Sequence, residues 1–314
     1  MKTTAGNVTA DDRRRALTMD RDRARIERLG IPQAGKVGFD AQRAVLVAVR
    51  RGASAIDVRG ILRSHILRLK PLILNGMLAA HLSGAQRTTA TTKGEVSALR
   101  LARGEPHEEA IKALQKRLQL PVDTLDAIRA RYEMKALRVL ENASEAAELQ
   151  IQEALLATTE AGEHVREGVK AVRSAFAEAG ITPDNSFTLE NLFRTQTQLA
   201  YGAGRWQAGQ DEAVQEILWG YKYVTVGDDR VRPEHQGLDG TTAPKDDPVW
   251  RTIWPPNGFS CRCSTIEIFE KRKTVLPPDV VEVDGKDYEP GPDKGFAFNP
   301  GEWFDALPSL LGEE

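Results

Sequence analysis

The sequence has few cysteines and no long apolar run. Only two of its 314 residues are cysteine, too few for the disulfide framework of a small secreted domain. Its longest apolar run near the front is Ala44–Val49, whereas a membrane-spanning helix needs roughly 18 such residues. The N-terminus is polar and rich in Arg and Asp, where a secretory signal would carry an apolar core. These absences predict no membrane contact and synthesis in a reducing cytoplasm.

The sequence also lacks the patterns of common catalytic sites. Gly202, Gly204 and Gly209 follow no strand and precede no Gly-Lys-Ser/Thr, so a phosphate-binding loop is not expected. Four histidines are scattered singly along helical segments, without a partner at metal-ligand spacing: His65, His81, His107 and His164. We therefore expect neither an enzyme nor a cofactor.

Charge is distributed unevenly along the chain, although the formal net charge is only −2. Residues 41–70 contain one acid, Asp57, and seven basic side chains: Arg43, Arg50, Arg51, Arg59, Arg63, Arg68 and Lys70. Residues 275–314 contain two lysines against ten acids. The six arginines of 41–70 are candidates for contact with DNA or an acidic partner, with a solvated helix face as the alternative.

The first 182 residues are predicted to form a helical arm or N-terminal domain. Residues 11–29 alternate in charge and predict a solvated, salt-bridged helix. Residues 40–82 predict two amphipathic helices separated at Arg51–Gly52, followed by a loop at Gly84–Gly94. Residues 122–161 contain no glycine or proline, so they form either one long helix or two that break near Asn142–Ser144. Residues Ile181–Asp184 are expected to link this half to a compact domain at 183–274, after which 275–314 form an acidic, Pro/Gly-rich extended tail.

Residues 221–268 contain both cysteines and most of the candidate site. Tyr221–Val226 is rich in β-branched and aromatic residues and predicts a strand, which the turn at Gly227–Asp229 ends. Pro233 suits the first turn of a short helix, and a second strand is expected near Phe259. Together with the helical half, this indicates an α+β fold with a small antiparallel sheet. We expect a structural polar network at one end of the sheet, formed by Arg194, Asp228, Arg232, His235, Cys261 and Cys263.

The two cysteines allow three interpretations. On a strand, Cys261 and Cys263 would face the same side and Arg262 the other. The favoured interpretation is that both are buried, reduced thiols packing the sheet, with no metal. A zinc site would use His235 with both cysteines, and perhaps Asp228, although C-x-C with one distant histidine lacks the paired spacings of ordinary structural sites. A catalytic thiol is the third interpretation.

Several ordered motifs in the last part of the chain resemble one protein family. A series formed by Trp219, Val224, Asp228 or its neighbour Asp229, Val231, Arg232 and His235 is followed by Leu238–Gly240, Asp247-Pro248-x-Trp250, Pro255-Pro256 and Cys261-Arg262-Cys263. Upstream lies Arg194-Thr195-Gln196, and downstream Gly295-Phe296-x-Phe298-Asn299-Pro300-Gly301. Over residues 188–301 the chain resembles the phage Mu F-like minor head proteins, also called the phage head morphogenesis family.

The resemblance implies a minor structural protein of a bacteriophage head that acts in procapsid assembly. Portal protein and capsid or scaffold would be its partners, packaged DNA a further neighbour during packaging or ejection, and several copies would sit in the procapsid interior or at the portal vertex. Modules of this type are also similar to domains fused to toxins and enzymes. A metal-dependent hydrolase or nuclease using His235, Cys261 and Cys263, with Asp228, is therefore the alternative.

Overall fold

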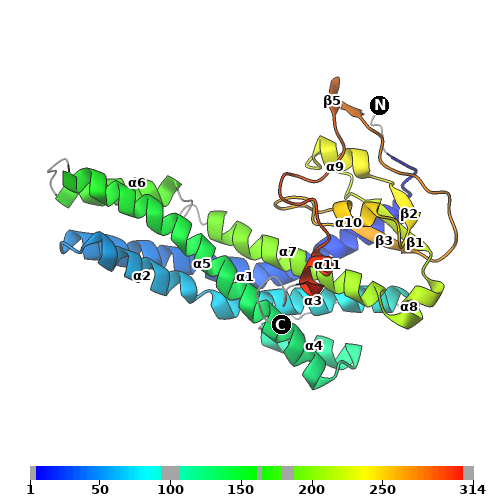
Figure 1. The fold of residues 1–314 in the computed structure, drawn as a ribbon, viewed down its shortest axis with the longest axis horizontal. Helices are drawn as coiled ribbons and strands as arrows, with labels where there is room; N and C mark the ends of the chain where they lie inside the picture. The colour runs from blue at the N-terminus through cyan, green and yellow to red at the C-terminus, as the bar shows by residue number, and fades with distance from the viewer. Residues whose placement is uncertain (1–4, 93–106, 161–164, 179–186, 307–314) are drawn as a thin grey trace. The chain divides into compact units, whose positions relative to one another are not determined.

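The structure is a computed structural model that describes residues 5–92, 107–160, 165–178 and 187–306. Eight helices come first in the described chain: α1 (Ala10–Arg50), α2 (Ala55–Leu67), α3 (Lys70–Thr92), α4 (His107–Leu118), α5 (Val122–Glu160), α6 (Val165–Glu178), α7 (Phe187–Gly209) and α8 (Glu212–Ile217). Strands and short helices follow: β1 (Gly220–Val224), α9 (Pro233–Leu238), β2 (Thr242–Pro244), α10 (Val249–Ile253), β3 (Ser264–Ile268), β4 (Val281–Val283), β5 (Lys286–Tyr288) and α11 (Pro300–Asp305). The predicted α+β class is confirmed (Figure 1).

The chain forms two compact units, each built from separate stretches of sequence. The sheet unit comprises Met1–Ile26, Ala79–Pro121 and Thr197–Glu314, and the helical unit comprises Glu27–Leu78 and Val122–Gln196. Helices α1, α3 and α7 contribute residues to both units. The predicted domain boundaries stay a prediction, and the expected linker Ile181–Asp184 lies outside the described residues.

The helical unit confirms the expected break at Arg51–Gly52. Helix α1 ends at Arg50, Gly52 has a φ of 79°, and Ser54 caps α2 in a capping box with Asp57. Val58, Leu62 and Ile66 recur at four-residue spacing and are buried, as an amphipathic helix requires. Helix α2 ends at Leu67 and α3 begins at Lys70, so 55–82 is not the single second helix that was predicted.

Helix α5 is one piece of 39 residues that continues through the suggested break near Asn142–Ser144. Three of its glutamates form ion pairs with basic side chains of α2 and α3: Arg59–Glu148 at 2.6 Å, Arg63–Glu141 at 3.7 Å and Lys70–Glu133 at 2.8 Å. Ion pairs between partly exposed side chains contribute about 0–1 kcal/mol each, so the apolar face of α2 stabilises this packing more than its charges do.

The sheet has the strand order β2-β1-β3, and both pairings are antiparallel. In its register, Gly220 pairs with Ile268 and Val224 with Ser264. The aromatic core against this sheet contains Trp206, Tyr221, Tyr223, Trp250 and Trp254. Val224 and Ile266 form a separate cluster with Ala16 of α1. A three-stranded sheet needs such cover to be stable.

The first turns of helix α1 bind residues of the sheet unit. The prediction that residues 11–29 are a solvated helix is wrong: the residues are helical, but Arg13 ion-pairs with the buried Asp239, and Arg15 with Glu267 at 3.4 Å. Arg23 is buried and donates from Nη1 to the backbone oxygen of Cys263 at 3.1 Å.

The predicted loop at Gly84–Gly94 is wrong as far as Thr92, where α3 ends, and 93–94 lie outside the described residues. Gly84 and Gly204 explain the difference. A Cβ built on Gly84 would lie 2.2 Å from the backbone oxygen of Tyr201, and one on Gly204 would lie 2.0 Å from that of His81. Glycine at these positions therefore permits close contact between α3 and α7, instead of ending a helix.

Residues 281–305 pack within the sheet unit. The β4–β5 hairpin contacts α9, and Phe296 and Phe304 are buried. Asn299 donates from Nδ2 to the backbone oxygen of Trp250 at 3.1 Å. The short α11 lies against α3 and α7 (Figure 1), where the rings of Phe304 and His81 are 5.1 Å apart.

Among the described residues, no helix is both long enough and apolar enough to cross a membrane.

Candidate functional site

His235, Cys261 and Cys263 lie together in the sheet unit. Nδ1 of His235 is 3.8 Å from Sγ of Cys261 and 3.9 Å from Sγ of Cys263. The three residues are only 1%, 2% and 3% exposed. Pro233 starts α9 two residues before the histidine, where its missing N–H leaves no helix hydrogen bond unmade. This confined cluster is the candidate site.

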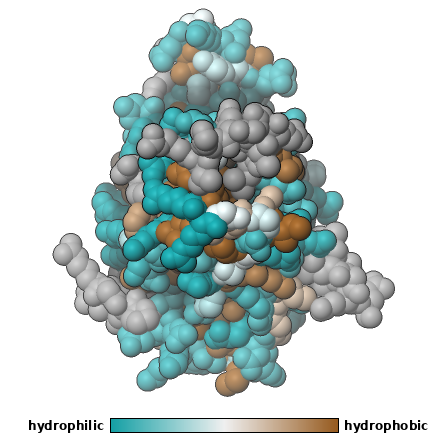
Figure 2. All heavy atoms as spheres, turned by 90° about the vertical axis from the view of Figure 1, so that its left-hand side faces the viewer, coloured by the Kyte–Doolittle hydropathy of each residue, from teal (hydrophilic) through white to brown (hydrophobic). Residues whose placement is uncertain are grey.

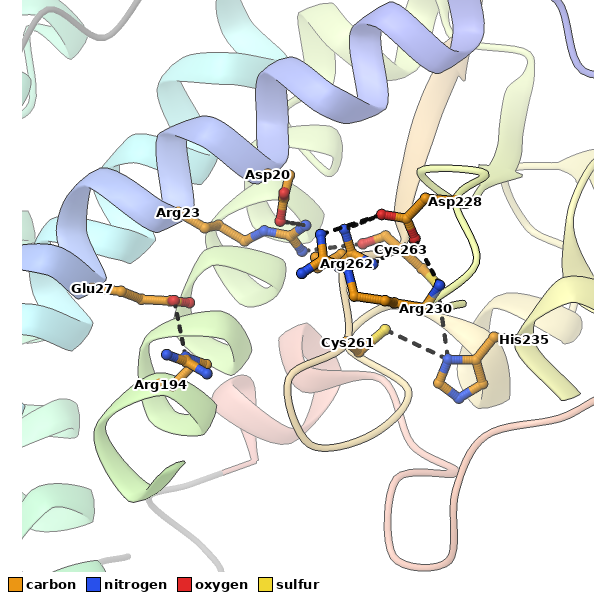
Figure 3. Close-up of polar contacts among 10 residues, drawn as sticks. All are labelled: Asp20, Arg23, Glu27, Arg194, Asp228, Arg230, His235, Cys261, Arg262 and Cys263. Carbon is orange, nitrogen blue, oxygen red and sulfur yellow. Dashed lines mark hydrogen bonds and ion pairs between the residues drawn. The ribbon is translucent and has the colours of Figure 1, made fainter. Parts of the chain in front are cut away.

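The two cysteines reach the histidine from a loop, not from a strand. The strand that was expected to begin near Phe259 is β3, which begins at Ser264. Both cysteines therefore precede it. Both sulfurs nevertheless face His235, while Arg262 extends to Asp228 (Figure 3). The expectation about the directions of the side chains is met although the expected strand is wrong, because extended loop backbone also alternates its side chains.

The hydrogen bonds of His235 define its tautomer. Nε2 lies 3.1 Å from the backbone oxygen of Asn257 and 3.2 Å from Oδ1 of Asp293. A backbone oxygen can only accept, so the proton is on Nε2. Nδ1 is therefore the ring nitrogen that faces the two sulfurs.

The thiols and the imidazole perturb one another. The hydrogen bond with Cys263, together with His235, lowers the pKa of Cys261 well below that of an ordinary thiol, although burial opposes this. The same thiol pairing and burial raise the pKa of Cys263. Burial lowers the pKa of His235, but Cys261 and Asp293 outweigh it, so that its pKa is raised. Cys261 is therefore the more acidic of the two thiols.

Asp228 belongs to a neighbouring ion pair and does not face His235. Arg262 donates from Nη1 and Nη2 to its two carboxylate oxygens at 2.7 and 2.6 Å, a bidentate contact. Arg230 also contacts this carboxylate, at 3.4 Å. Arg232 donates to the backbone oxygen of Phe259 at 2.7 Å, and its Nε lies 3.5 Å from Asp293. Arg230, Arg232 and Arg262 are thus all bound to a carboxylate or to a backbone oxygen.

Replacement of Asp228 by asparagine tests this ion pair through its pH dependence. The Arg262 hydrogen bonds lower the pKa of Asp228 from 3.8 to about 2. The pair therefore contributes stability above pH 3.8, and its contribution disappears as the pH falls to about 2. We expect Asp228→Asn to lower the free energy of unfolding by up to about 1 kcal/mol at neutral pH, and the two proteins to converge in acid. A difference that stays constant across an acid titration of urea unfolding would contradict this assignment.

The remaining member of the predicted network lies in the helical unit. Nε of Arg194 ion-pairs with Oε2 of Glu27 at 3.1 Å (Figure 3). Asp228 and Asp239 are paired with other arginines, Asp228 with Arg262 and Asp239 with Arg13. The role of the six residues as one functional network stays a prediction.

A second polar cluster was missed from the sequence. Glu267 is fully buried and ion-pairs with Arg205 and Arg15, and it accepts a hydrogen bond from Thr88 at 3.0 Å. Burial raises its pKa, but the two arginines outweigh burial and the pKa is lowered. The sequence does contain a signal for this cluster, because Glu267 stands between Ile266 and Ile268 in a short strand. A buried acid at such a position requires a charged partner.

The six arginines of 41–70 divide into two groups. Arg59 and Arg63 are engaged with α5. Arg43, Arg51 and Arg68 line, with His65, an open cavity of about 720 Å³ between α1 and α2. No ion pair joins these three arginines to another described residue. Figure 2 shows a mainly hydrophilic surface at the end where α1 passes into α2, and Arg50 is exposed nearby.

Comparison with known proteins gives the cluster its context. Residues 149–266 match the family described as Phage Mu protein F like protein. The predicted resemblance is confirmed for this segment, which contains His235, both cysteines and the elements from α7 to α10, and ends within β3. The Mu F-like segment begins before the predicted residue 188, and it ends before Gly295–Gly301, whose resemblance stays a prediction.

Two curated relatives are similar over 75 residues, 24% of this chain. The "Putative capsid assembly protein F" of Escherichia phage Mu is 41% identical there, and the "Mu-like prophage FluMu F protein" of Haemophilus influenzae is 37% identical. The similar stretch covers 17% and 18% of these relatives, less than a fifth of their length. No solved structure matches the chain.

Proposed function

We propose that this protein is a minor structural component of a bacteriophage head that acts during procapsid assembly. The observation that carries the proposal is the Mu F-like segment at 149–266, together with similarity to a protein named for capsid assembly. Its partners would be the portal protein and the capsid or scaffold, and its site the procapsid interior or the portal vertex. Several copies would be present in each particle.

The geometry of the sheet unit supports a binding role. Two of its buried carboxylates are paired internally: Asp239 with Arg13, and Glu267 with Arg205. Buried ion pairs of this kind restrain the elements that they join. A rigid module can present a fixed surface to a partner at a small entropic cost.

The hydrolase alternative requires a substrate to reach His235. The histidine is 1% exposed, and its Nε2 is occupied by Asn257 and Asp293. A general base must come within hydrogen-bond distance of the proton it removes. No geometric observation therefore favours hydrolysis. Metal-dependent turnover of DNA or nucleotides by the purified chain would favour the hydrolase over the binding role.

Particle composition tests the main proposal. Mass spectrometry of purified procapsids and mature particles should detect this chain in both, in few copies relative to the major capsid protein. Purified portal assemblies should retain the full chain in co-sedimentation. A chain that is missing from particles and does not bind portal would contradict the proposal.

The cavity between α1 and α2 suggests that the helical unit also contacts DNA or an acidic partner. Three arginines, a histidine and one acid, Asp40, line it, and a hollow in which basic side chains predominate concentrates negatively charged groups. Each arginine that contacts a phosphate adds about 0.9 to the slope of log affinity against log salt. Binding to duplex DNA should therefore weaken steeply as salt is raised.

Arg51→Glu tests this contact, with Arg138→Glu as the matched control. Both side chains are exposed, and Arg138 lies on α5 away from the residues that line the cavity. We expect Arg51→Glu to reduce the salt slope by about 1 and Arg138→Glu to leave it unchanged. Equal effects of the two substitutions, or binding that does not depend on salt, would exclude the cavity as a DNA contact. An acidic protein partner would then be tested with the same pair of variants.

A further inference from the structure

The side chains of His235, Cys261 and Cys263 have the spacing of metal ligands. One ligand atom of each lies within 4.8 Å of the others, and the two nitrogen–sulfur distances are 3.8 and 3.9 Å. In tetrahedral zinc sites the metal–sulfur distance is about 2.3 Å and the metal–nitrogen distance about 2.0–2.1 Å, which separates the ligand atoms by about 3.6–3.8 Å. The two nitrogen–sulfur distances need to contract by only a few tenths of an ångström to match, and the third side of the triangle is no longer than 4.8 Å.

We propose that Nδ1 of His235 and the sulfurs of Cys261 and Cys263 bind a zinc ion that joins α9 to the loop before β3. Among the described residues, these are the only His, Cys, Asp and Glu side chains that converge there. The fourth tetrahedral position is left for a water molecule. On binding, each thiol loses its proton to solvent, because the thiolate is the ligand.

Charge balance favours a divalent ion at this buried position. Two thiolates and a neutral imidazole compensate the two positive charges of zinc, so the complex carries no net charge. Isolated buried charges are costly, whereas this complex places none in the core. The carboxylate of Asp293 beyond the ring is paired separately, with Arg232.

The surroundings of His235 match those of a metal-binding histidine. Such histidines usually donate the other ring N–H to a carboxylate or a backbone oxygen, which orients the ring. Here Nε2 has both kinds of acceptor, Asp293 and Asn257. Asn257 is itself held, because Tyr223 donates its hydroxyl proton to Oδ1 at 2.9 Å. Arg23 fixes the loop from the other side by its hydrogen bond to the Cys263 backbone oxygen.

The loop geometry removes the objection raised by the sequence. C-x-C with one distant histidine lacks paired ligand spacings, but α9 brings the histidine to both sulfurs across the 26 residues to Cys261. Asp228, the other ligand candidate, is bound by Arg262 instead. The ligand set is therefore His and two Cys, without Asp228.

Metal content of the full chain is the direct test. Protein produced in zinc-supplemented medium and purified under reducing conditions should contain about one zinc per chain by elemental analysis, the stoichiometry of a single site. Cys263→Ser should lose stoichiometric zinc, and Asp228→Asn, the matched neighbour, should keep it. Wild-type protein with zinc only at background level would overturn the proposal.

Cobalt substitution tests the ligands without any variant. The chain has only these two cysteines, so a sulfur-to-cobalt charge-transfer band in the cobalt-loaded wild type must come from this site. Both thiols should resist alkylation in the zinc form and react after chelation and unfolding. Cobalt-loaded protein with no sulfur charge-transfer band would also overturn the proposal.

Asp293→Asn tests the support of the histidine. It keeps the side-chain volume and all three ligands, so it should fold, but we expect zinc affinity to fall by about 10–100-fold. Competition with a chromophoric chelator measures this change. Unaltered affinity would show that Asp293 does not position a metal ligand, and would count against the site as described.

Discussion

Replacing Glu267 with glutamine is expected to lower the free energy of unfolding by about 3–5 kcal/mol, the usual cost of leaving a buried charge without its partner. The carboxylate is fully buried and neutralises Arg205, whose side chain is itself only 4% exposed. Arg15 approaches the same carboxylate from α1. The neutral amide would leave two guanidinium groups together in the interior of the sheet unit. Urea unfolding of the full chain, followed by tryptophan fluorescence, measures the loss.

Glu270→Gln is the matched control for this prediction. Glu270 lies two residues beyond the end of β3 and pairs with Arg272, but its side chain is 81% exposed. Exposed pairs contribute about 0–1 kcal/mol, so this variant should unfold close to wild type. If Glu267→Gln were no more destabilising than Glu270→Gln, the buried cluster would not stabilise the sheet.

Alanine at Gly204 is expected to destabilise the sheet unit by about 3 kcal/mol, the upper end of the usual cost of overpacking. The added Cβ would lie 2.0 Å from the backbone oxygen of His81. A backbone atom inside α3 cannot move aside as a flexible side chain would, so the two helices must separate. Thermal unfolding of the variant should show a clearly lowered midpoint.

Gly60→Ala is the same substitution at a position where we expect it to raise the stability of the protein. Gly60 is exposed in the interior of α2, and a Cβ there would meet nothing within 4 Å. Alanine at such a position should stabilise the helical unit by about 0.5–1 kcal/mol, since it reduces the freedom of the unfolded chain. Destabilisation by both variants would show that packing between α3 and α7 is not what requires Gly204.

Local sequence patterns predicted the elements that depend on local chemistry. The strand at β1, the turn that starts at Gly227, the start of α9 at Pro233 and the break at Arg51–Gly52 all follow from the residues found there. Each results from backbone preferences of the residue itself, such as the fixed φ of proline or the freedom of glycine. Such preferences act wherever the residue stands in the chain.

Features that depend on distant partners were not predictable in the same way. The arginines of residues 11–29 resemble a solvated helix because their acidic partners, Asp239 and Glu267, lie more than 200 residues away. Gly84 looks like a loop residue until α7 is known to pass beside it. The ligand triangle depends on the same kind of information, since Cys261 and His235 belong to different elements.

The contact of Arg13 with Asp239 has a consequence for the order of folding. The two residues are 226 positions apart, and ribosomes add about 5–20 residues per second, so the N-terminal helix waits roughly 10–50 s for its partner. During that interval the sheet has not yet been synthesised, so the arginines of this helix and the apolar residues between them stay exposed to solvent. The nascent chain would thus remain open to chaperones, or to premature association with other proteins, until Asp239 has left the ribosome.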